Sequence, residues 1–165
     1  MTAADFSTCD LCDPRKGDTD GAFRVLPPVF ASYGGRSKFC GPVRTVRCFE
    51  DNTSVKALLE SPGQGAVLVV DGGGSVRRAL VGGNIAAAAA ANGWAGVVVN
   101  AAVRDKAELA AAGVGLLARA LIPMPSDRKA PGQVDVALQI EGVWVRPGDW
   151  LYADEDGVVV TPAPA

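Results

Sequence analysis

The sequence contains no histidine, and this absence excludes several kinds of active site. A Ser-His-Asp triad, a Cys-His pair and a zinc site of the H-E-x-x-H type all need an imidazole. Proton transfer must therefore depend on carboxylates, Lys, Tyr, Cys or a metal-bound water. A metal site must be built from oxygen or sulfur ligands, and oxygen ligands favour a hard cation such as Mg²⁺ or Mn²⁺.

Long apolar runs and an excess of positive charge are also missing. No stretch approaches the roughly 20 apolar residues that cross a bilayer, and the first residues lack the layout of a signal peptide. The formal net charge is −2, whereas a nucleic-acid partner would require concentrated Lys and Arg. We therefore expect a cytoplasmic protein that has neither a membrane nor a nucleic acid as its partner.

Cysteine is scarce, with four residues in the chain. Cys9 and Cys12 form a C-x-x-C, which is found in redox pairs and in halves of zinc sites. Cys40 and Cys48 do not supply a second C-x-x-C. We favour reduced thiols that pack as small hydrophobic side chains, and we assign no function to them.

The residues that are present predict one α/β domain over residues 1–165. A chain of this length with 48% apolar residues can bury one core but not two. Residues 1–30 contain Asp13-Pro14 and Pro27-Pro28, and they are interpreted as an irregular arm that begins with a short helix at most. The rest of the chain carries regular patterns.

Apolar strand patterns alternate with helix patterns through the middle of the chain. Asn52 and Asn84 are predicted to cap two of the helices, and Asn92-Gly93 ends the second. This order predicts a mainly parallel sheet, in which ligands bind beyond the carboxyl ends of the strands. Strands are predicted at residues 39–49, 66–70 and 96–100, and helices at residues 52–59, 84–91 and 106–112.

The last third changes to short strands separated by tight turns, at residues 134–140, 143–145, 150–152 and 158–160. Close spacing with glycine turns is typical of antiparallel strands. The fold class is therefore α/β, with a central, mainly parallel sheet and an antiparallel layer.

Two features predict an anion and metal site. Gly82 and Gly83 precede an alanine-rich helix, whose unpaired amides and positive dipole end suit a carboxylate or phosphate. Arg104 can grip a carboxylate with two hydrogen bonds, while Asp105 and Glu108 can hold a hard cation from one face of a helix. The alternatives are a tight turn at the glycines and a surface pair in which Asp105 caps the helix. Glu50, Asp51 and residues 154–156 are interpreted as solvated turn charges, unless one of them reaches the site of a neighbouring subunit.

The sequence also resembles a known family in several segments, which follow one another in the family's order. They include Tyr33-Gly34-Gly35-Arg36, Gly72-Gly73-Gly74-Ser75 and Val103-Arg104-Asp105. The full set is residues 29–36, 41–52, 69–75, 92–99, 103–105 and 147–157. On these segments the chain resembles the RraA-like family, which includes the regulator of ribonuclease activity A and the 4-hydroxy-4-methyl-2-oxoglutarate aldolases.

This resemblance implies a swivelling β/β/α three-layer domain, assembled as a homotrimer with sites between subunits. Lyases of the family carry a glycine, twenty residues, Arg-Asp, two residues and an acid, which here are Gly83, Arg104-Asp105 and Glu108. The implied activity is that of a class II pyruvate aldolase and oxaloacetate decarboxylase that acts on small 2-oxo acids.

The resemblance also implies roles for the site residues. Asp105 would hold the divalent cation, Mg²⁺ or Mn²⁺, and Glu108 would support it through water. Arg104 would bind substrate and stabilise a pyruvate enolate. The amides of Gly82, Gly83, Asn84 and Ile85 would bind the substrate carboxylate.

Two departures and two alternatives accompany the resemblance. Ala101 stands where relatives usually have glycine, and residues 123–129 replace a Pro-Arg-Lys-Ser pattern, which affects substrate choice if the loop reaches the site. The main alternative function is a non-catalytic inhibitor of an RNA-degrading endonuclease. A methyltransferase fits poorly, because no glycine motif is placed to bind a methyl donor.

Overall fold

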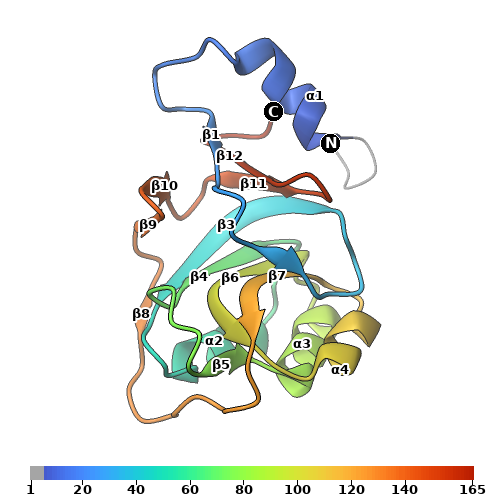
Figure 1. The fold of residues 1–165 in the computed structure, drawn as a ribbon, viewed down its shortest axis with the longest axis vertical. Helices are drawn as coiled ribbons and strands as arrows, with labels where there is room; N and C mark the ends of the chain where they lie inside the picture. The colour runs from blue at the N-terminus through green and yellow to red at the C-terminus, as the bar shows by residue number, and fades with distance from the viewer. Residues whose placement is uncertain (1–5) are drawn as a thin grey trace.

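A computed structural model describes residues 6–165, which form a ten-stranded mixed sheet, a separate two-stranded sheet and short helices (Figure 1). The helices are α1 (Thr8–Cys12), the 3-10 helix η1 (Asp13–Arg15), α2 (Thr53–Leu59), α3 (Gly83–Ala91) and α4 (Lys106–Ala111). The strands are β1 (Arg24–Val25), β2 (Ala31–Ser32), β3 (Phe39–Arg47), β4 (Val67–Asp71), β5 (Ala79–Val81), β6 (Gly96–Val103), β7 (Gly115–Leu121), β8 (Gln133–Val134), β9 (Leu138–Ile140), β10 (Val143–Val145), β11 (Trp150–Ala153) and β12 (Val158–Thr161).

The centre of the large sheet is parallel, as the alternation of strands and helices predicts. β3, β4, β6 and β7 lie side by side in this order, and each neighbouring pair is parallel. All eight residues of β6 are buried, because this strand has neighbours on both sides and cores on both faces. The helices α2, α3 and α4 lie together on one face of the sheet (Figure 1).

The segment between β4 and β5 determines where α3 begins. β4 ends at Asp71, and a turn follows in which Gly73 and Gly74 adopt φ values of 67° and 71°. β5 then pairs in parallel with the last part of β6, with Ala79 opposite Ala102. Because α3 follows β5 directly, its N-terminus lies at the carboxyl ends of β5 and β6.

Apolar cores lie on both faces of the sheet. Val70 packs toward the helices, while Val69 packs toward β9, β10, β11 and β12. β3 joins the two halves, since its first four residues pair antiparallel with β11 and its last five pair parallel with β4. The layers are antiparallel strands, mainly parallel strands and helices, which is the expected three-layer β/β/α order.

The prediction of one continuous strand over residues 134–140 is wrong. The structure has β8 and β9 instead, and Asp135 between them adopts a φ of 53°. The Asp135 carboxylate accepts two hydrogen bonds from Arg44, at 2.9 and 2.7 Å. The left-handed backbone of Asp135 ends the ladder, so the alternating pattern does not continue as one strand.

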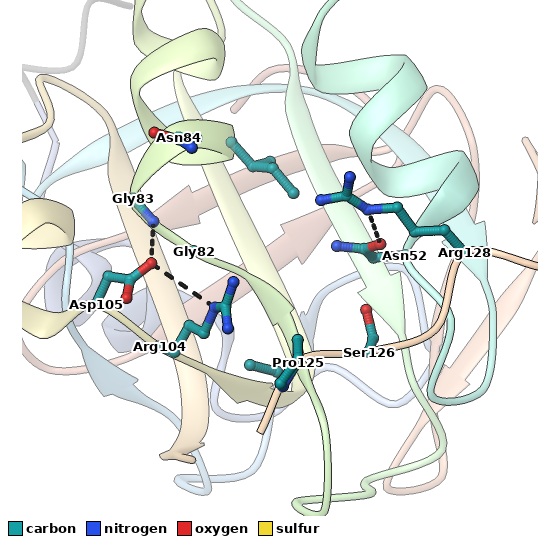
Figure 2. A pocket seen from close by; sticks show the side chains of 11 residues that line it. Asn52, Gly82, Gly83, Asn84, Arg104, Asp105, Pro125, Ser126 and Arg128 are labelled. Atoms are coloured by element: carbon teal, nitrogen blue, oxygen red, sulfur yellow. Dashed lines mark hydrogen bonds and ion pairs between the residues drawn. The ribbon is translucent and has the colours of Figure 1, made fainter. Parts of the chain in front are cut away.

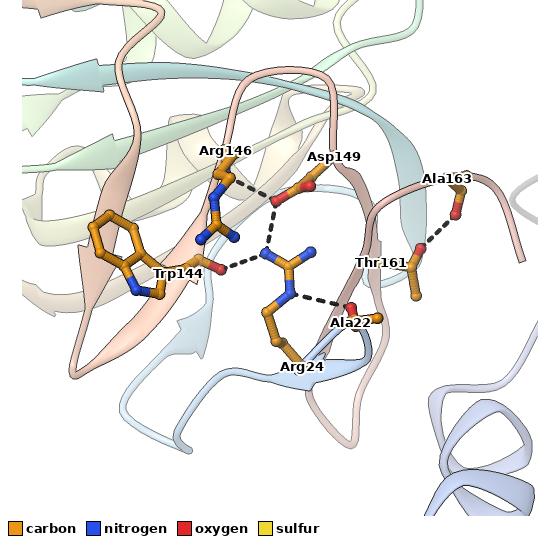
Figure 3. A network of polar contacts seen from close by, with 7 residues as sticks. All are labelled: Ala22, Arg24, Trp144, Arg146, Asp149, Thr161 and Ala163. Atoms are coloured by element: carbon orange, nitrogen blue, oxygen red, sulfur yellow. Dashed lines mark hydrogen bonds and ion pairs between the residues drawn. The ribbon is translucent and has the colours of Figure 1, made fainter. Parts of the chain in front are cut away.

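The N-terminal segment is tied to the C-terminal strands. The short helix predicted there is α1, whereas β1 was not predicted; it pairs with β12, with Arg24 opposite Val160. Figure 3 shows the Arg24 guanidinium donating to the Asp149 carboxylate and to the Trp144 carbonyl, both at 2.8 Å. This ion pair is largely buried, and it connects β1 to the turn before β11. Residues 1–5 of the predicted arm lie outside the described residues.

No helix within residues 6–165 is both long and apolar enough to cross a bilayer. All four cysteines are free thiols. Burial, together with the carboxylates of Asp51 and Asp71, raises the pKa of Cys48 to about 12. A thiol with so high a pKa is unreactive at neutral pH.

Candidate active site

A small cleft opens at the carboxyl ends of β5 and β6, where the parallel sheet is expected to bind ligands (Figure 2). Its volume is about 70 Å³, which is room for several water-sized groups and therefore for a small ligand. It is lined by Asn52, Ala79, Gly82, Gly83, Asn84, Ile85, Arg104, Asp105, Pro125, Ser126 and Arg128.

The start of α3 differs from the prediction by two residues. Gly82, not Asn84, is the residue before the helix, and it has an extended backbone with no side chain to cap the helix. The cap comes from elsewhere in the chain, because the amide of Gly83 donates to Asp105 Oδ2 at 2.9 Å. Asn84 therefore occupies the second helical position, and no residue among 6–165 accepts a hydrogen bond from the amides of Asn84 and Ile85.

The two glycines provide space for carboxylates. Neither has a positive φ, so a tight turn does not explain them. A Cβ atom added at Gly82 would lie 2.7 Å from Asp105 Oδ2, and one added at Gly83 would overlap the Glu108 carboxylate. Both acidic side chains therefore approach the start of α3 because these positions lack side chains.

Arg104 and Asp105 project from the end of β6. The amide of Arg104 donates to the carbonyl of Val81 at 3.0 Å, which fixes the two strand ends together. Asp105 stands before α4 with a φ of 65°, but its side chain makes no capping bond to that helix. Its Oδ2 lies 3.8 Å from Arg104 Nε, and the two side chains are 39% and 40% exposed. Asp105 thus occupies the cap position of α4, as the alternative interpretation predicted, but its side chain does not make the capping hydrogen bond.

Glu108 lies beside the cleft, not in its lining. It is in the first turn of α4, and its carboxylate faces Gly83. No group of three or more Cys, Asp or Glu side chains among residues 6–165 is arranged to hold a metal. Two carboxylates still fit Mg²⁺, which usually keeps several waters and uses one or two protein carboxylates together with substrate oxygens.

The opposite wall of the cleft includes residues of the 123–129 loop, which was predicted to affect substrate choice, although none of them was predicted as a site residue. It is formed by Ser126 and Arg128, which follow β7, and by Asn52 before α2. The carbonyl of Met124 accepts from the amide of Ala79 at 2.8 Å, and the Ala79 carbonyl accepts from Ser126 at 3.2 Å. These backbone bonds bring an irregular segment alongside β5, and no periodic pattern in the sequence indicates them.

Asp51 and Asn52 differ from their predicted roles. Asp51 is only 7% exposed, and its carboxylate accepts from the amides of Lys129 and Ala130 at 2.6 and 3.0 Å. Burial acts to raise its pKa, but the hydrogen bonds from Thr53, Lys129 and Ala130 outweigh burial and hold the pKa well below its usual range. The prediction of a solvated turn charge is therefore wrong for Asp51. The side chain of Asn52 does not cap α2; it donates to the carbonyl of Leu80 at 3.0 Å.

Two other acidic turn residues, Glu50 and Asp154, have hydrogen-bond partners outside the cleft. Glu50 accepts hydrogen bonds from Ser75 and Arg77 at 2.8 and 2.6 Å. Asp154 accepts from the backbone amide and the hydroxyl of Thr8 at 2.7 and 2.6 Å. Within one chain, neither residue lines the cleft.

Comparisons with known proteins cover nearly the whole chain. A model of the RraA-like family, described as Aldolase/RraA, matches residues 8–160. A protein of Albidiferax ferrireducens named "Putative 4-hydroxy-4-methyl-2-oxoglutarate aldolase" is 64% identical over 163 residues, covering 94% of each chain. The solved structure of the RNA-processing inhibitor RraA from Thermus thermophilus superposes with a TM-score of 0.91 at 50% identity, covering 98% of this chain and 95% of the other.

A third similar protein carries another description. It is a structure from Geobacillus kaustophilus described as an S-adenosylmethionine:2-dimethylmenaquinone methyltransferase, with a TM-score of 0.88 and 42% identity. The match covers 96% of both chains. Three different activities are thus attached to proteins that share this fold, so function must be argued from the cleft.

Proposed function

The chain belongs to the RraA-like family, and from this premise we propose that it is a divalent-metal-dependent C–C lyase that acts on small 2-oxo acids. The proposed reactions are aldol cleavage of 4-hydroxy-4-methyl-2-oxoglutarate and decarboxylation of oxaloacetate. Both release pyruvate through its enolate. The name of the Albidiferax ferrireducens relative supports the aldolase part of this proposal.

One observation carries the proposal: an arginine, a carboxylate and two free backbone amides meet in one small cleft. The free amides of Asn84 and Ile85 belong to the first turn of α3, where the helix dipole is positive. They suit the carboxylate next to the oxo group of the substrate. Arg104 stands across the strand ends from them and suits the adjacent oxo oxygen (Figure 2).

Asp105 and Glu108 would hold the cation, with Asp105 as the direct ligand and Glu108 acting through water. Both are oxygen donors, which Mg²⁺ and Mn²⁺ prefer, and the chain offers no histidine that would favour zinc. When bound, the cation would withdraw electrons from the oxo group of the substrate and so stabilise the enolate.

The residues of the chain then have defined tasks in aldol cleavage. A base removes the proton of the C4 hydroxyl, the C3–C4 bond breaks, and its electron pair becomes the enolate of pyruvate. The C4 fragment leaves as a second pyruvate, and a proton added at C3 completes the first. Arg104 stabilises the enolate oxygen, while the α3 amides keep the C1 carboxylate in place.

Decarboxylation of oxaloacetate uses the same residues. The bond to the distal carboxylate breaks, CO₂ leaves, and the electron pair again becomes pyruvate enolate. Because the charge develops on the same oxygen, the interactions that assist one reaction assist the other. One cleft therefore serves both substrates.

The first test is pyruvate release from both substrates with Mg²⁺ or Mn²⁺, repeated with excess EDTA. Metal-catalysed decay of oxaloacetate without protein is subtracted. We expect release that depends on the protein and that EDTA abolishes, because the cation stabilises the enolate. Release that persists fully in EDTA would contradict metal dependence.

Asp105→Asn is the matched variant. It keeps the size of the side chain but weakens the metal ligand, and we expect kcat/KM to fall by more than about a hundredfold, beyond the 10- to 100-fold typical of losing an outer-sphere partner. Circular dichroism and thermal unfolding serve as controls for the fold. Undiminished turnover in this variant would remove Asp105 from the metal site.

The second candidate function is inhibition of an RNA-degrading endonuclease. The RNA-processing inhibitor from Thermus thermophilus, at 50% identity, supports it. Inhibition acts through a protein–protein contact, so Asp105→Asn should leave it intact while lyase activity is lost. An endonuclease assay on an RNA substrate, with and without the wild-type chain and this variant, separates the two functions.

A further inference from the structure

We propose that Arg128 and Ser126, with Asn52 positioning Arg128, form a second carboxylate site opposite Arg104, which selects 2-oxo acids that carry a distal carboxylate. This inference rests on the proposed function, because it assigns the distal end of the substrate for the same cleft. It concerns a part of the cleft that the family motif at Gly83, Arg104, Asp105 and Glu108 does not include.

Ser126 supplies the first observation. Its hydroxyl is the one buried side-chain oxygen or nitrogen among residues 6–165 that has no hydrogen-bond partner. Buried polar groups are nearly always paired, and an unpaired one indicates a missing partner. Ser126 lines the cleft, so its unpaired hydroxyl lies in this wall, and a small shift of the side chain would let it donate to a ligand.

Arg128 supplies the second observation. Its Nε donates to Asn52 Oδ1 at 3.3 Å, while its two terminal nitrogens donate to no acceptor among residues 6–165. No carboxylate in the described chain lies within ion-pair distance of it. A guanidinium with both terminal nitrogens free can bind a carboxylate with two parallel hydrogen bonds.

One side-chain hydrogen bond and the neighbouring backbone orient the exposed Arg128. Asn52 is buried, and its amide nitrogen donates to the carbonyl of Leu80, so its oxygen is held toward Arg128. The backbone after Arg128 is fixed by the bonds from Lys129 and Ala130 to the Asp51 carboxylate. A guanidinium held in place before binding loses less conformational entropy when a ligand arrives.

The charges of the cleft also favour a dianion. Figure 2 shows the guanidinium groups of Arg104 and Arg128 on opposite sides, both directed toward the middle. Asp105, the one carboxylate in the described lining, lies on the Arg104 side and would be engaged with the cation. The Arg128 side is therefore positive, and it suits the second carboxylate of a four- or five-carbon 2-oxo diacid.

The test compares two probes that the enzyme does not cleave. 2-Oxoglutarate and 2-oxopentanoate have the same five-carbon chain and the same 2-oxo acid end, but only the first has a carboxylate at C5. Their dissociation constants are measured by calorimetry with Mg²⁺ present. The proteins are the wild type, Arg128→Met, Arg128→Lys and Ser126→Ala, with Lys129→Met as control because Lys129 is basic but does not line the cleft.

We expect the wild type to bind 2-oxoglutarate about 10- to 100-fold more tightly than 2-oxopentanoate, as a charge-assisted hydrogen-bonded pair provides. Arg128→Met should bring this ratio close to one, and Arg128→Lys should keep part of it. Ser126→Ala should lower it several-fold. Lys129→Met should keep the wild-type ratio. Ser126→Ala also tests whether the hydroxyl contacts the ligand. Removing an unpaired buried hydroxyl does not by itself change ligand selectivity, so a lower ratio indicates a lost contact with the ligand and not a structural defect.

A ratio near one in the wild type, or an equal ratio in the wild type and in Arg128→Met, would overturn the proposal. The same holds if neither probe binds. Failure of the proposed function gives a different result: the two oxo acids are then distinguished in binding through Arg128, while no pyruvate is released from 4-hydroxy-4-methyl-2-oxoglutarate or oxaloacetate.

Discussion

At the scale of single residues, the most informative positions in the cleft are those without side chains. Gly82 and Gly83 let the carboxylates of Asp105 and Glu108 approach the backbone of α3. The glycine that starts the sequence motif is therefore explained by the fold, because Gly83, the first residue of the motif, contacts Glu108, the last. The distance between them in the sequence hides this contact.

Gly83→Ala should weaken metal binding without unfolding the chain. The added methyl group would overlap the Glu108 carboxylate and lie 2.7 Å from Glu108 Cβ, so the whole side chain must move away from the proposed cation. We expect the dissociation constant of Mn²⁺ to rise about 10- to 100-fold, the usual effect of losing an outer-sphere partner. Titration followed by electron paramagnetic resonance measures it.

Gly113→Ala is the control for this substitution. Gly113 is exposed, has no atom within 4 Å of an added Cβ, and needs no left-handed backbone. It should bind Mn²⁺ as the wild type does. If Gly83→Ala also binds Mn²⁺ with wild-type affinity, Glu108 takes no part in holding the cation.

At the scale of elements, Asp51 ties the segment after β7 to the start of α2. Its Oδ2 accepts from two amides of that segment, and its Oδ1 accepts from the amide and the hydroxyl of Thr53. The wall that carries Arg128 has little regular structure of its own, so this carboxylate holds it in place. Four accepted hydrogen bonds favour the ionised form of Asp51, because protonation would replace one acceptor by a donor.

Acid should therefore loosen this wall. The pKa of Asp51 is lower in the folded chain than in the unfolded chain. Its contribution to the free energy of unfolding is therefore complete above the unfolded pKa of about 4. This contribution is lost as pH falls through the folded pKa. Asp51→Asn should cost about 2 kcal/mol at pH 7, since hydrogen bonds to a charged group are lost.

The measurement is urea unfolding of the wild type and of Asp51→Asn between pH 7 and pH 3. The difference between them should shrink toward the acid end. Asp18→Asn, at an exposed carboxylate, should leave the unfolding midpoint unchanged at every pH. A constant difference between the wild type and Asp51→Asn across this range would contradict the role given to Asp51.

The elements also show what the sequence can and cannot predict. Buried apolar runs and alanine-rich helices identify β3, β4, β6, α2, α3 and α4, and their order predicts the parallel sheet and the position of Arg104 and Asp105. These predictions depend on local patterns, which the structure preserves. The break at Asp135 and the cap of α3 were missed because each is made by a distant partner, Arg44 in one case and Asp105 in the other.

The same reason explains the unpredicted half of the cleft. Ser126 and Arg128 reach it through backbone pairing with Ala79, which lies far away in the sequence. Pairing of this kind depends on the folded backbone, not on the residue types. The resemblance therefore marks residues 123–129 as a departure from the family, but no pattern identifies Ser126 and Arg128 as lining residues. The motif residues, in contrast, lie beside elements that the pattern identifies: Arg104 and Asp105 come shortly after the strand predicted over residues 96–100, and Gly83 precedes the predicted alanine-rich helix.

At the scale of the whole molecule, the cleft of one chain lacks a free base. Among the described residues that line it, Asp105 is the one carboxylate, and it is assigned to the cation. Water or a carboxylate of a neighbouring copy must then accept the proton from the substrate. We propose a homotrimer in which neighbouring copies complete the sites.

Light scattering should give three times the mass of one chain. The activity per chain should fall on dilution once the trimer dissociates, because a separated chain has lost the neighbour that closes its cleft. The two measurements are made on the same dilution series with Mg²⁺ present. A monomer with full activity per chain would rule out any contribution of a neighbouring copy.

The double pairing of β3 has a consequence during translation. Its first four residues must wait for β11, which leaves the ribosome only after the chain has passed residue 149. Until then this edge is open to strands of other nascent chains. Pro42 has no amide hydrogen to donate, and Gly41 beside it is a poor strand former, so the waiting edge is a weak template for aggregation. Gly41 and Pro42 thus disfavour wrong pairing of this strand before β11 is available.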